Sequence, residues 1–177
     1  MVVLCVKKGI ILYLNGVTSA GKSTIAKEIQ KKSELNFYHL SHDIFQQMVS
    51  PKFLRQNYFK HLGEAILQAY QTAKLMSDNG INIIYDGMIL ELGELKPHHQ
   101  KIKTIFKDSN IKFIEVYCPL EICKQRNIER QDRGANQSEE QSQIMAKGVE
   151  YDISVDTSVN SAEQCAKIII NSIFNRP

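Results

Sequence analysis

Residues 16–23 leave this chain little freedom in how it can fold, because glycine, lysine and serine recur there at the spacing G-x-x-x-x-G-K-S. An apolar run at residues 10–15 precedes the segment, and a helical pattern begins at Lys22. A strand, a glycine loop and a helix in this order are the setting in which the spacing binds phosphate. The sequence therefore predicts a site for a nucleoside triphosphate.

Each part of the loop has its own expected task. Gly16 and Gly21 are expected to adopt positive φ angles and to let the backbone approach phosphate. Successive N–H groups then form an anion nest, and the following helix directs its positive end to the same place. Lys22 is expected to reach the β- and γ-phosphates, and Ser23 to bind Mg²⁺. The predicted nucleotide contacts in this loop are Gly16, Val17, Thr18, Ser19, Ala20, Gly21, Lys22, Ser23 and Thr24.

Apolar runs alternate with helical patterns along the whole chain. Strands are predicted at residues 10–15, 37–40, 81–87, 111–118 and 153–156. Helices are predicted at residues 22–32, 44–47, 58–78, 98–107 and 119–130, from residue 138, and at residues 161–173, with a loop at 50–57. This alternation predicts a single α/β domain over residues 1–177, with a five-stranded parallel sheet and helices on both faces.

Two aspartates stand at or just past the carboxyl ends of predicted strands, at the sheet edge where ligands bind in open parallel sheets. Asp43 follows the second strand and is a candidate catalytic residue; the alternative is a helix N-cap. Asp86 ends the third strand and suits a carboxylate near Mg²⁺; the alternative is a turn residue before Gly87.

Three arginines precede a glycine-containing polar segment and predict a lid over residues 126–147. Arginine guanidinium groups match phosphoryl oxygens in a bidentate way. Arg130 and Arg133 are candidates for the transferred phosphoryl group, and Arg126 is a candidate nucleotide contact. The alternative is that all three are ordinary solvated helix charges.

The charge, hydropathy and cysteine content of the chain argue against several other classes of function. The net charge of +3 and the absence of a basic tract give no case for nucleic-acid or membrane binding. No apolar segment is long enough to span a bilayer. The four cysteines form no C-x-x-C pair, which favours a reduced, cytoplasmic protein. His98 and His99 are adjacent and would point apart on a helix, so a shared metal is not expected.

Several segments resemble the chloramphenicol phosphotransferase-like proteins. They are the glycine loop, Asp43, and residues 116–121, 126–133, 151–152, 155–158 and 162–166. The resemblance covers nearly the whole chain and is strongest from Phe113 onward. It implies a three-layer P-loop kinase fold, and ATP- and Mg²⁺-dependent phosphorylation of a hydroxyl on a small molecule.

The resemblance also implies roles for particular residues. Asp43 would take the proton of the acceptor hydroxyl, and residues 156–158 would lie near the base of the nucleotide. Residues 44–60 and 87–105 match the family least, and these segments would select the acceptor. The acceptor and the oligomeric state therefore stay open. A nucleoside, nucleotide or sugar kinase is one alternative, and a non-catalytic nucleotide-binding module is another.

Overall fold

The computed structural model describes residues 7–130, 134 and 136–174 of the 177-residue chain. Its centre is a five-stranded sheet in the order β2-β3-β1-β4-β5, and every pair of neighbouring strands is parallel. The strands are β1 (Ile10–Asn15), β2 (Phe37–Ser41), β3 (Asn82–Gly87), β4 (Asn110–Tyr117) and β5 (Ile153–Asp156). The predicted five-stranded parallel sheet is confirmed.

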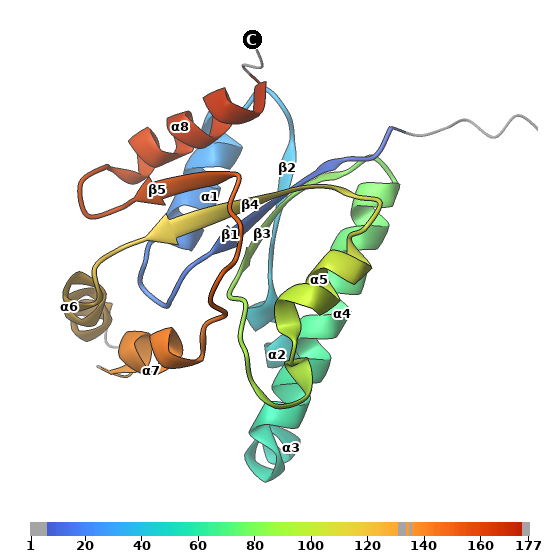
Figure 1. Cartoon of the computed structure of the whole chain (residues 1–177), viewed down its shortest axis with the longest axis vertical. Coiled ribbons are helices and arrows are strands. Elements are labelled where there is room, and N and C mark those ends of the chain that lie inside the picture. Colours follow the sequence, from blue (N-terminus) through green and yellow to red (C-terminus); the bar gives the residue numbers. More distant parts are fainter. Residues whose placement is uncertain (1–6, 131–133, 135, 175–177) are drawn as a thin grey trace, which may run out of the picture.

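Helices cover both faces of the sheet and make three layers (Figure 1). One face carries α1 (Lys22–Lys32) and α8 (Ala162–Phe174), and the other carries α4 (Tyr58–Asp78) and α5 (His98–Ile105). The remaining elements are α2 (His42–Met48), α3 (Pro51–Gln56), the 3₁₀ turn η1 (Gly93–Leu95), α6 (Leu120–Arg130) and α7 (Gln137–Ile144). No helix within the described ranges is long and apolar enough to cross a bilayer.

The core forms because the central strand and the helices present apolar side chains to each other. Every residue of β1 is buried between β3 and β4. The helix α4 buries a stripe that includes Leu62, Ile66 and Ala69, at the three- and four-residue spacing of one helical face. Truncating a fully buried residue such as Ile66 to alanine is expected to cost about 2–5 kcal/mol of stability.

Three local expectations from the sequence are wrong. Residues 50–57 are not a loop, because Pro51 begins α3 at a position where its missing N–H costs nothing. Asp43 is not the N-cap of α2; Ser41 is, and its hydroxyl accepts the Asp43 N–H at 3.2 Å. Gly16 is not among the residues with positive φ, whereas Ser19 has a φ of 59° and Gly21 a φ of 101°.

The order of the strands decides where a ligand can bind. The chain leaves β1 toward β2 on one side and later returns to β4 on the other, so the direction of winding changes beside β1. Open parallel sheets bind ligands at the carboxyl edge of such a switch point. Asp86 pairs in register with Leu14 of β1 and Ser41 of β2, which brings the ends of three strands to one edge.

Candidate active site

The phosphate loop has the geometry that its sequence predicts, although for partly different reasons. A Cβ atom on Gly16 would lie 2.5 Å from the carbonyl oxygen of Val116, so close backbone contact requires glycine there. Gly21 is required by its left-handed conformation. Ser19 takes the same region of φ without being glycine, and strained conformations of this kind concentrate at ligand-binding sites.

Lys22 lies folded across its own loop. Its Nζ donates hydrogen bonds to the carbonyl oxygens of Gly16 at 2.8 Å and Val17 at 3.0 Å. The same nitrogen is 4.0 Å from Oδ1 of Asp86. The ammonium group therefore stands between the loop and the end of β3, where it can meet the phosphates of a nucleotide.

Ser23 and Asp86, the two residues predicted to bind Mg²⁺, are in direct contact. The Ser23 hydroxyl donates to Oδ2 of Asp86 at 2.5 Å, and Nε2 of His39 lies 3.4 Å from the same oxygen. Burial raises the pKa of Asp86, but His39, the Lys22 ammonium and the Ser23 hydroxyl together lower it to about 2. The carboxylate is therefore ionised at neutral pH.

Magnesium fits this pair of oxygen donors, because Mg²⁺ prefers one or two protein oxygens together with substrate phosphates. No group of three or more metal-ligating His, Cys, Asp or Glu side chains occurs among the described residues. The site thus suits a nucleotide-bound ion and not a closed protein cage.

Asp43 lies beside a histidine that the sequence analysis did not single out. Nε2 of His42 is 3.4 Å from Oδ1 of Asp43. Burial lowers the pKa of His42, against the opposite effect of the Asp43 carboxylate, and this favours the neutral imidazole. A Cβ on Gly87 would lie 2.6 Å from the ring of Tyr85 and 3.2 Å from Nδ1 of His42, so the glycine after Asp86 makes room for both rings. His42 could have been found from the sequence, because it follows the end of β2 directly and precedes Asp43.

Two cavities meet at Asp43. The phosphate cleft is lined by Gly16, Thr18, Ser19, Gly21, Lys22, Ser23, Thr24, Ser41, His42, Asp43, Asp86, Gly87, Met88, Arg130 and Gln141. The second, which we call the side cavity, has a volume of about 420 Å³ and is lined by His42, Asp43, Gln46, Gln47, Leu54, Tyr58, Leu62, Met88, Leu90, Gln137 and Gln141. The two share His42, Asp43, Met88 and Gln141.

The lid arginines have different positions. Arg130 lines the phosphate cleft, as expected for a phosphate ligand. Arg126 donates to the carbonyl oxygens of Ser19 at 3.3 Å and Thr157 at 2.9 Å, so it ties the loop to the segment after β5. Its predicted contact with the nucleotide stays a prediction. Arg133 lies outside the described residues.

A third cavity, of about 340 Å³, lies on the Thr157 side of the loop. Its lining includes Gly21, Thr24, Arg126, Thr157 and Asn160. The sequence resemblance puts the base of the nucleotide near residues 156–158, on this side of the loop, and that assignment stays a prediction.

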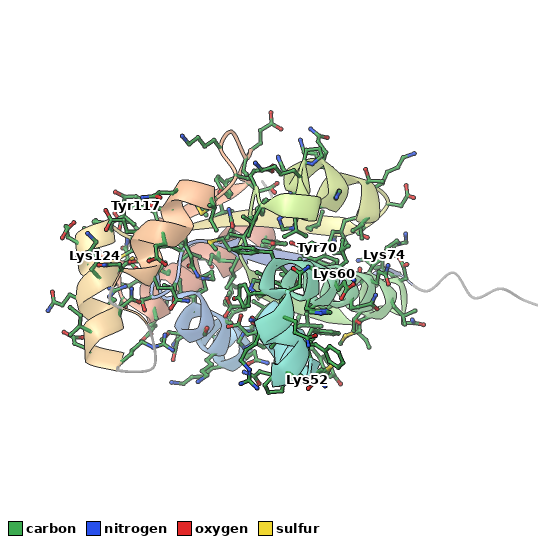
Figure 2. The ribbon with its side chains drawn as sticks, turned by 90° about the horizontal axis from the view of Figure 1, so that it is seen from below. Lys52, Lys60, Tyr70, Lys74, Tyr117 and Lys124 are labelled. Atoms are coloured by element: carbon green, nitrogen blue, oxygen red, sulfur yellow. The ribbon has the colours of Figure 1, made fainter. Side chains whose placement is uncertain are left out.

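The floor of the side cavity is held by buried polar groups. Oδ1 of Asn15 accepts the Ile89 N–H at 2.9 Å, and Nδ1 of His98 lies 2.8 Å from the backbone nitrogen of Leu90. Nε2 of His98 is 2.8 Å from the hydroxyl of Tyr70. Tyr70 lies in the interior of the molecule, whereas Lys52 and Lys124 lie at its periphery (Figure 2). Burial lowers the pKa of His98 to about 4, so the ring is neutral.

Side chains from α6 and α7 also bind the phosphate loop. The Ser19 hydroxyl donates to Oδ1 of Asn127 at 2.6 Å, and Nδ2 of Asn127 donates to the Ser138 hydroxyl at 3.2 Å. The Thr18 N–H donates to Oε1 of Gln141 at 2.6 Å. These contacts could not be predicted from the sequence, because neutral polar residues on helices that look exposed match no motif.

Comparisons with known proteins agree with this geometry. A family model described as chloramphenicol phosphotransferase-like protein matches residues 9–174. The adenylyl-sulfate kinase of Halothermothrix orenii is 26% identical over 131 residues, which cover 69% of this chain and 63% of that protein. The adenylyl-sulfate kinase of Clostridium acetobutylicum is 28% identical over 178 residues, which cover 93% of this chain and 82% of that protein. The chain thus spans less than two thirds of the first enzyme and most of the second.

A solved structure shares the fold. The APS kinase of Mycobacterium tuberculosis in complex with AMPPNP and APS superposes with a TM-score of 0.68 at 17% sequence identity. The superposition covers 94% of this chain and 98% of that chain. The three-layer arrangement described above is therefore that of the P-loop kinases.

Proposed function

The chain belongs to the chloramphenicol phosphotransferase-like family of ATP-dependent phosphotransferases, and we propose that it transfers the γ-phosphoryl group of ATP to a hydroxyl of a small, neutral molecule. The observation that carries this proposal is the position of Asp43, which lines both the phosphate cleft and the side cavity. A carboxylate at this junction can contact an acceptor hydroxyl in one cavity and the phosphoryl group in the other.

The phosphate cleft supplies the donor half of the reaction. Backbone N–H groups of the loop bind the β-phosphate, and Lys22 and Arg130 offset the negative charge of the transferred group. Arg133, beyond the described residues, is proposed for the same task. The remaining proposed contacts of the loop with the nucleotide are Gly16, Val17, Ala20 and Thr24. Arg126 is proposed to contact the nucleotide near its base.

Ser23 and Asp86 would hold Mg²⁺ in this cleft. When bound, the ion supplies positive charge against the phosphate oxygens. The low pKa of Asp86 supports this role, because the carboxylate needs no deprotonation before it can bind a cation.

Asp43 would orient the acceptor hydroxyl and take its proton. The hydroxyl oxygen forms a bond to the γ-phosphorus, the bond from that phosphorus to the β–γ bridging oxygen breaks, and ADP leaves. Phosphoryl transfer of this kind depends mainly on positioning and on electrostatic stabilisation. His42, neutral and 3.4 Å from the carboxylate, supports the orientation of Asp43 without neutralising its charge.

The side cavity fits a neutral acceptor with an apolar part. Its described lining combines Leu54, Leu62, Met88 and Leu90 with four glutamines, and includes no lysine or arginine. Asp43 is the only carboxylate in that described lining, so an anionic acceptor would be repelled without a compensating cation. A volume of about 420 Å³ is in the range of sites for drug-sized ligands.

Chloramphenicol, which is neutral and carries hydroxyl groups, is one acceptor of this class, and a sugar or a nucleoside is another. The adenylyl-sulfate kinases among the relatives are named for an anionic acceptor, which makes adenylyl sulfate the natural competing candidate. A non-catalytic nucleotide-binding module is the third possibility.

A panel of acceptors with radiolabelled ATP and Mg²⁺ distinguishes these functions. We expect label on a neutral hydroxyl compound from a panel of chloramphenicol, nucleosides and sugars, and none on adenylyl sulfate. Labelling of adenylyl sulfate alone would overturn the neutral-acceptor proposal. Slow release of inorganic phosphate with no labelled acceptor would favour the binding module.

We propose a cytoplasmic location for the protein. The thiols of Cys118, Cys123 and Cys165 are free and buried, and burial raises the pKa of Cys123 to about 12. Unreactive, reduced thiols of this kind suit a reducing compartment.

A further inference from the structure

The helix α7 contacts both halves of the proposed site. At its first turns, Ser138 and Gln141 reach the phosphate loop, Ser138 through Asn127 and Gln141 directly at Thr18. At its end and just past it, the backbone pairs with the segment after β3: the Glu91 N–H donates to the Ile144 carbonyl at 2.7 Å, and the Ala146 N–H to the Ile89 carbonyl at 2.8 Å. This short helix is therefore a link between the donor and acceptor halves.

Gln141 is the residue of α7 that lines both cavities. Its orientation follows from its partner. A backbone N–H can only donate, so the oxygen of the Gln141 amide must face Thr18, at 2.6 Å, and the NH₂ group must face away from it. Within the described part of the chain, no group accepts a hydrogen bond from that NH₂.

The contact also changes what the loop can offer a nucleotide. The Thr18 N–H is already paired with Gln141, so the loop presents its later N–H groups to phosphate while this one is held by a side chain. A neutral amide that is fixed at one end and carries two free donors at the other is suited to an anion that arrives beside it.

We propose that Gln141 is a positioning residue of the transfer reaction, with its amide oxygen fixing the phosphate loop at Thr18 and its NH₂ group donating to the γ-phosphoryl group where the two cavities meet. This inference rests on the proposed function, since it needs ATP as the donor. It assigns to α7 the task of holding the transferred group in line with the acceptor hydroxyl. If Gln141 only held the phosphate loop in place, its loss would change the affinities for ATP and ADP equally.

Two substitutions separate the two ends of the amide. Gln141→Glu keeps an oxygen that can accept the Thr18 N–H, but replaces the NH₂ donor by a negatively charged oxygen. Gln141→Leu removes both contacts at similar volume. Gln143→Leu is the matched control, because Gln143 is exposed on the same helix.

Affinities for ADP and for the ATP analogue AMPPNP, measured by calorimetry with Mg²⁺, test the proposal without knowledge of the acceptor. Loss of a hydrogen bond to a charged group costs about 1.5–3 kcal/mol, which is about 10- to 150-fold in affinity. We expect Gln141→Glu to lose at least tenfold in AMPPNP affinity, with ADP affinity and melting temperature close to those of the wild type. Gln141→Leu should lose affinity for AMPPNP more than for ADP, and Gln143→Leu should lose neither.

Three results would overturn the proposal. Equal losses of ADP and AMPPNP affinity in both variants would mean that Gln141 only supports the loop. Wild-type affinities in both variants would mean that it does not act at all. A wild-type protein that binds neither nucleotide would remove the proposed function itself, and is thereby distinguishable from a failure of the Gln141 assignment.

Discussion

The proposed donor and acceptor halves of this site are built in different ways. The donor half consists of residues 16–24 with Asp86 from the neighbouring strand, and its internal contacts are short: Lys22 binds the carbonyl of Gly16, and Ser23 binds Asp86. The proposed acceptor half is the side cavity, whose lining is drawn from α2, α3, α4, the segment after β3, and α7.

This difference explains why the donor half can be recognised from the sequence and the acceptor half cannot. Phosphate has one shape and charge, so a short loop with fixed spacing is enough to bind it. An acceptor must be distinguished from many other molecules, and selective contacts can come from any segment that lines the cavity. Asp43 and Gln141 stand where the halves meet. The predictions below act in turn on the donor half, on the junction, and on the floor of the acceptor half.

The largest effect is expected in the donor half, where Lys22→Ala should abolish detectable transfer from ATP. Removing the ammonium group takes away positive charge from the transferred phosphoryl group, and the loss of one such contact typically costs about 10²- to 10³-fold in rate. We expect transfer from ATP to fall by at least that factor in an assay with labelled ATP. Lys27→Ala, at an exposed position of the same helix, is the matched control. Full activity of Lys22→Ala would refute the assignment of the loop.

The junction is tested by Asp43→Asn, which keeps the shape of the side chain and removes the base. General-base catalysis contributes about 10²- to 10⁴-fold, so kcat should fall by that range while the affinity for ADP stays nearly unchanged. Steady-state kinetics and calorimetry measure the two quantities. Asp108→Asn, at an exposed turn, is the control. If ADP affinity falls and kcat does not, Asp43 is a nucleotide-binding residue and not the base.

The smallest effect is expected on stability, through the floor of the acceptor half. The pKa of His98 is about 4 in the folded protein and about 6.5 in an unfolded chain, so the unfolded state binds more protons between these values. The contribution of the buried neutral ring is complete above pH 6.5 and is lost as the pH falls toward 4. Integrated over this window the loss is about 3 kcal/mol.

Denaturant unfolding at pH 7 and pH 5 checks this expectation. The wild type should be less stable at pH 5, and His98→Gln should show a smaller difference between the two values. His61→Gln, whose ring is not part of the cavity floor, should behave as the wild type does. The donor half should not contribute to this loss, because the pKa of Asp86 is about 2 and its carboxylate stays ionised at pH 5. A difference between pH 7 and pH 5 that is unchanged in His98→Gln would contradict this expectation.

The sequence by itself determined the donor half and the layers of the fold. A strand, a glycine loop and a helix are contiguous, so the spacing of Gly16, Gly21 and Lys22 encodes the geometry locally. The alternation of apolar runs with helical patterns was likewise sufficient for a parallel sheet, because each run buries its own strand. Asp43 and Asp86 could be found for the same reason, since Asp86 lies at the carboxyl end of β3 and Asp43 just past the end of β2.

Only the tertiary structure decided the rest. The need for glycine at position 16 comes from the carbonyl of Val116, 100 residues away in the chain, and not from its own φ angle. The side cavity, the neutral His42 beside Asp43, and the contact of Gln141 with Thr18 all join segments that carry no mutual signal in sequence. Contacts between distant segments depend on how the layers pack, and packing is a property of the folded molecule as a whole.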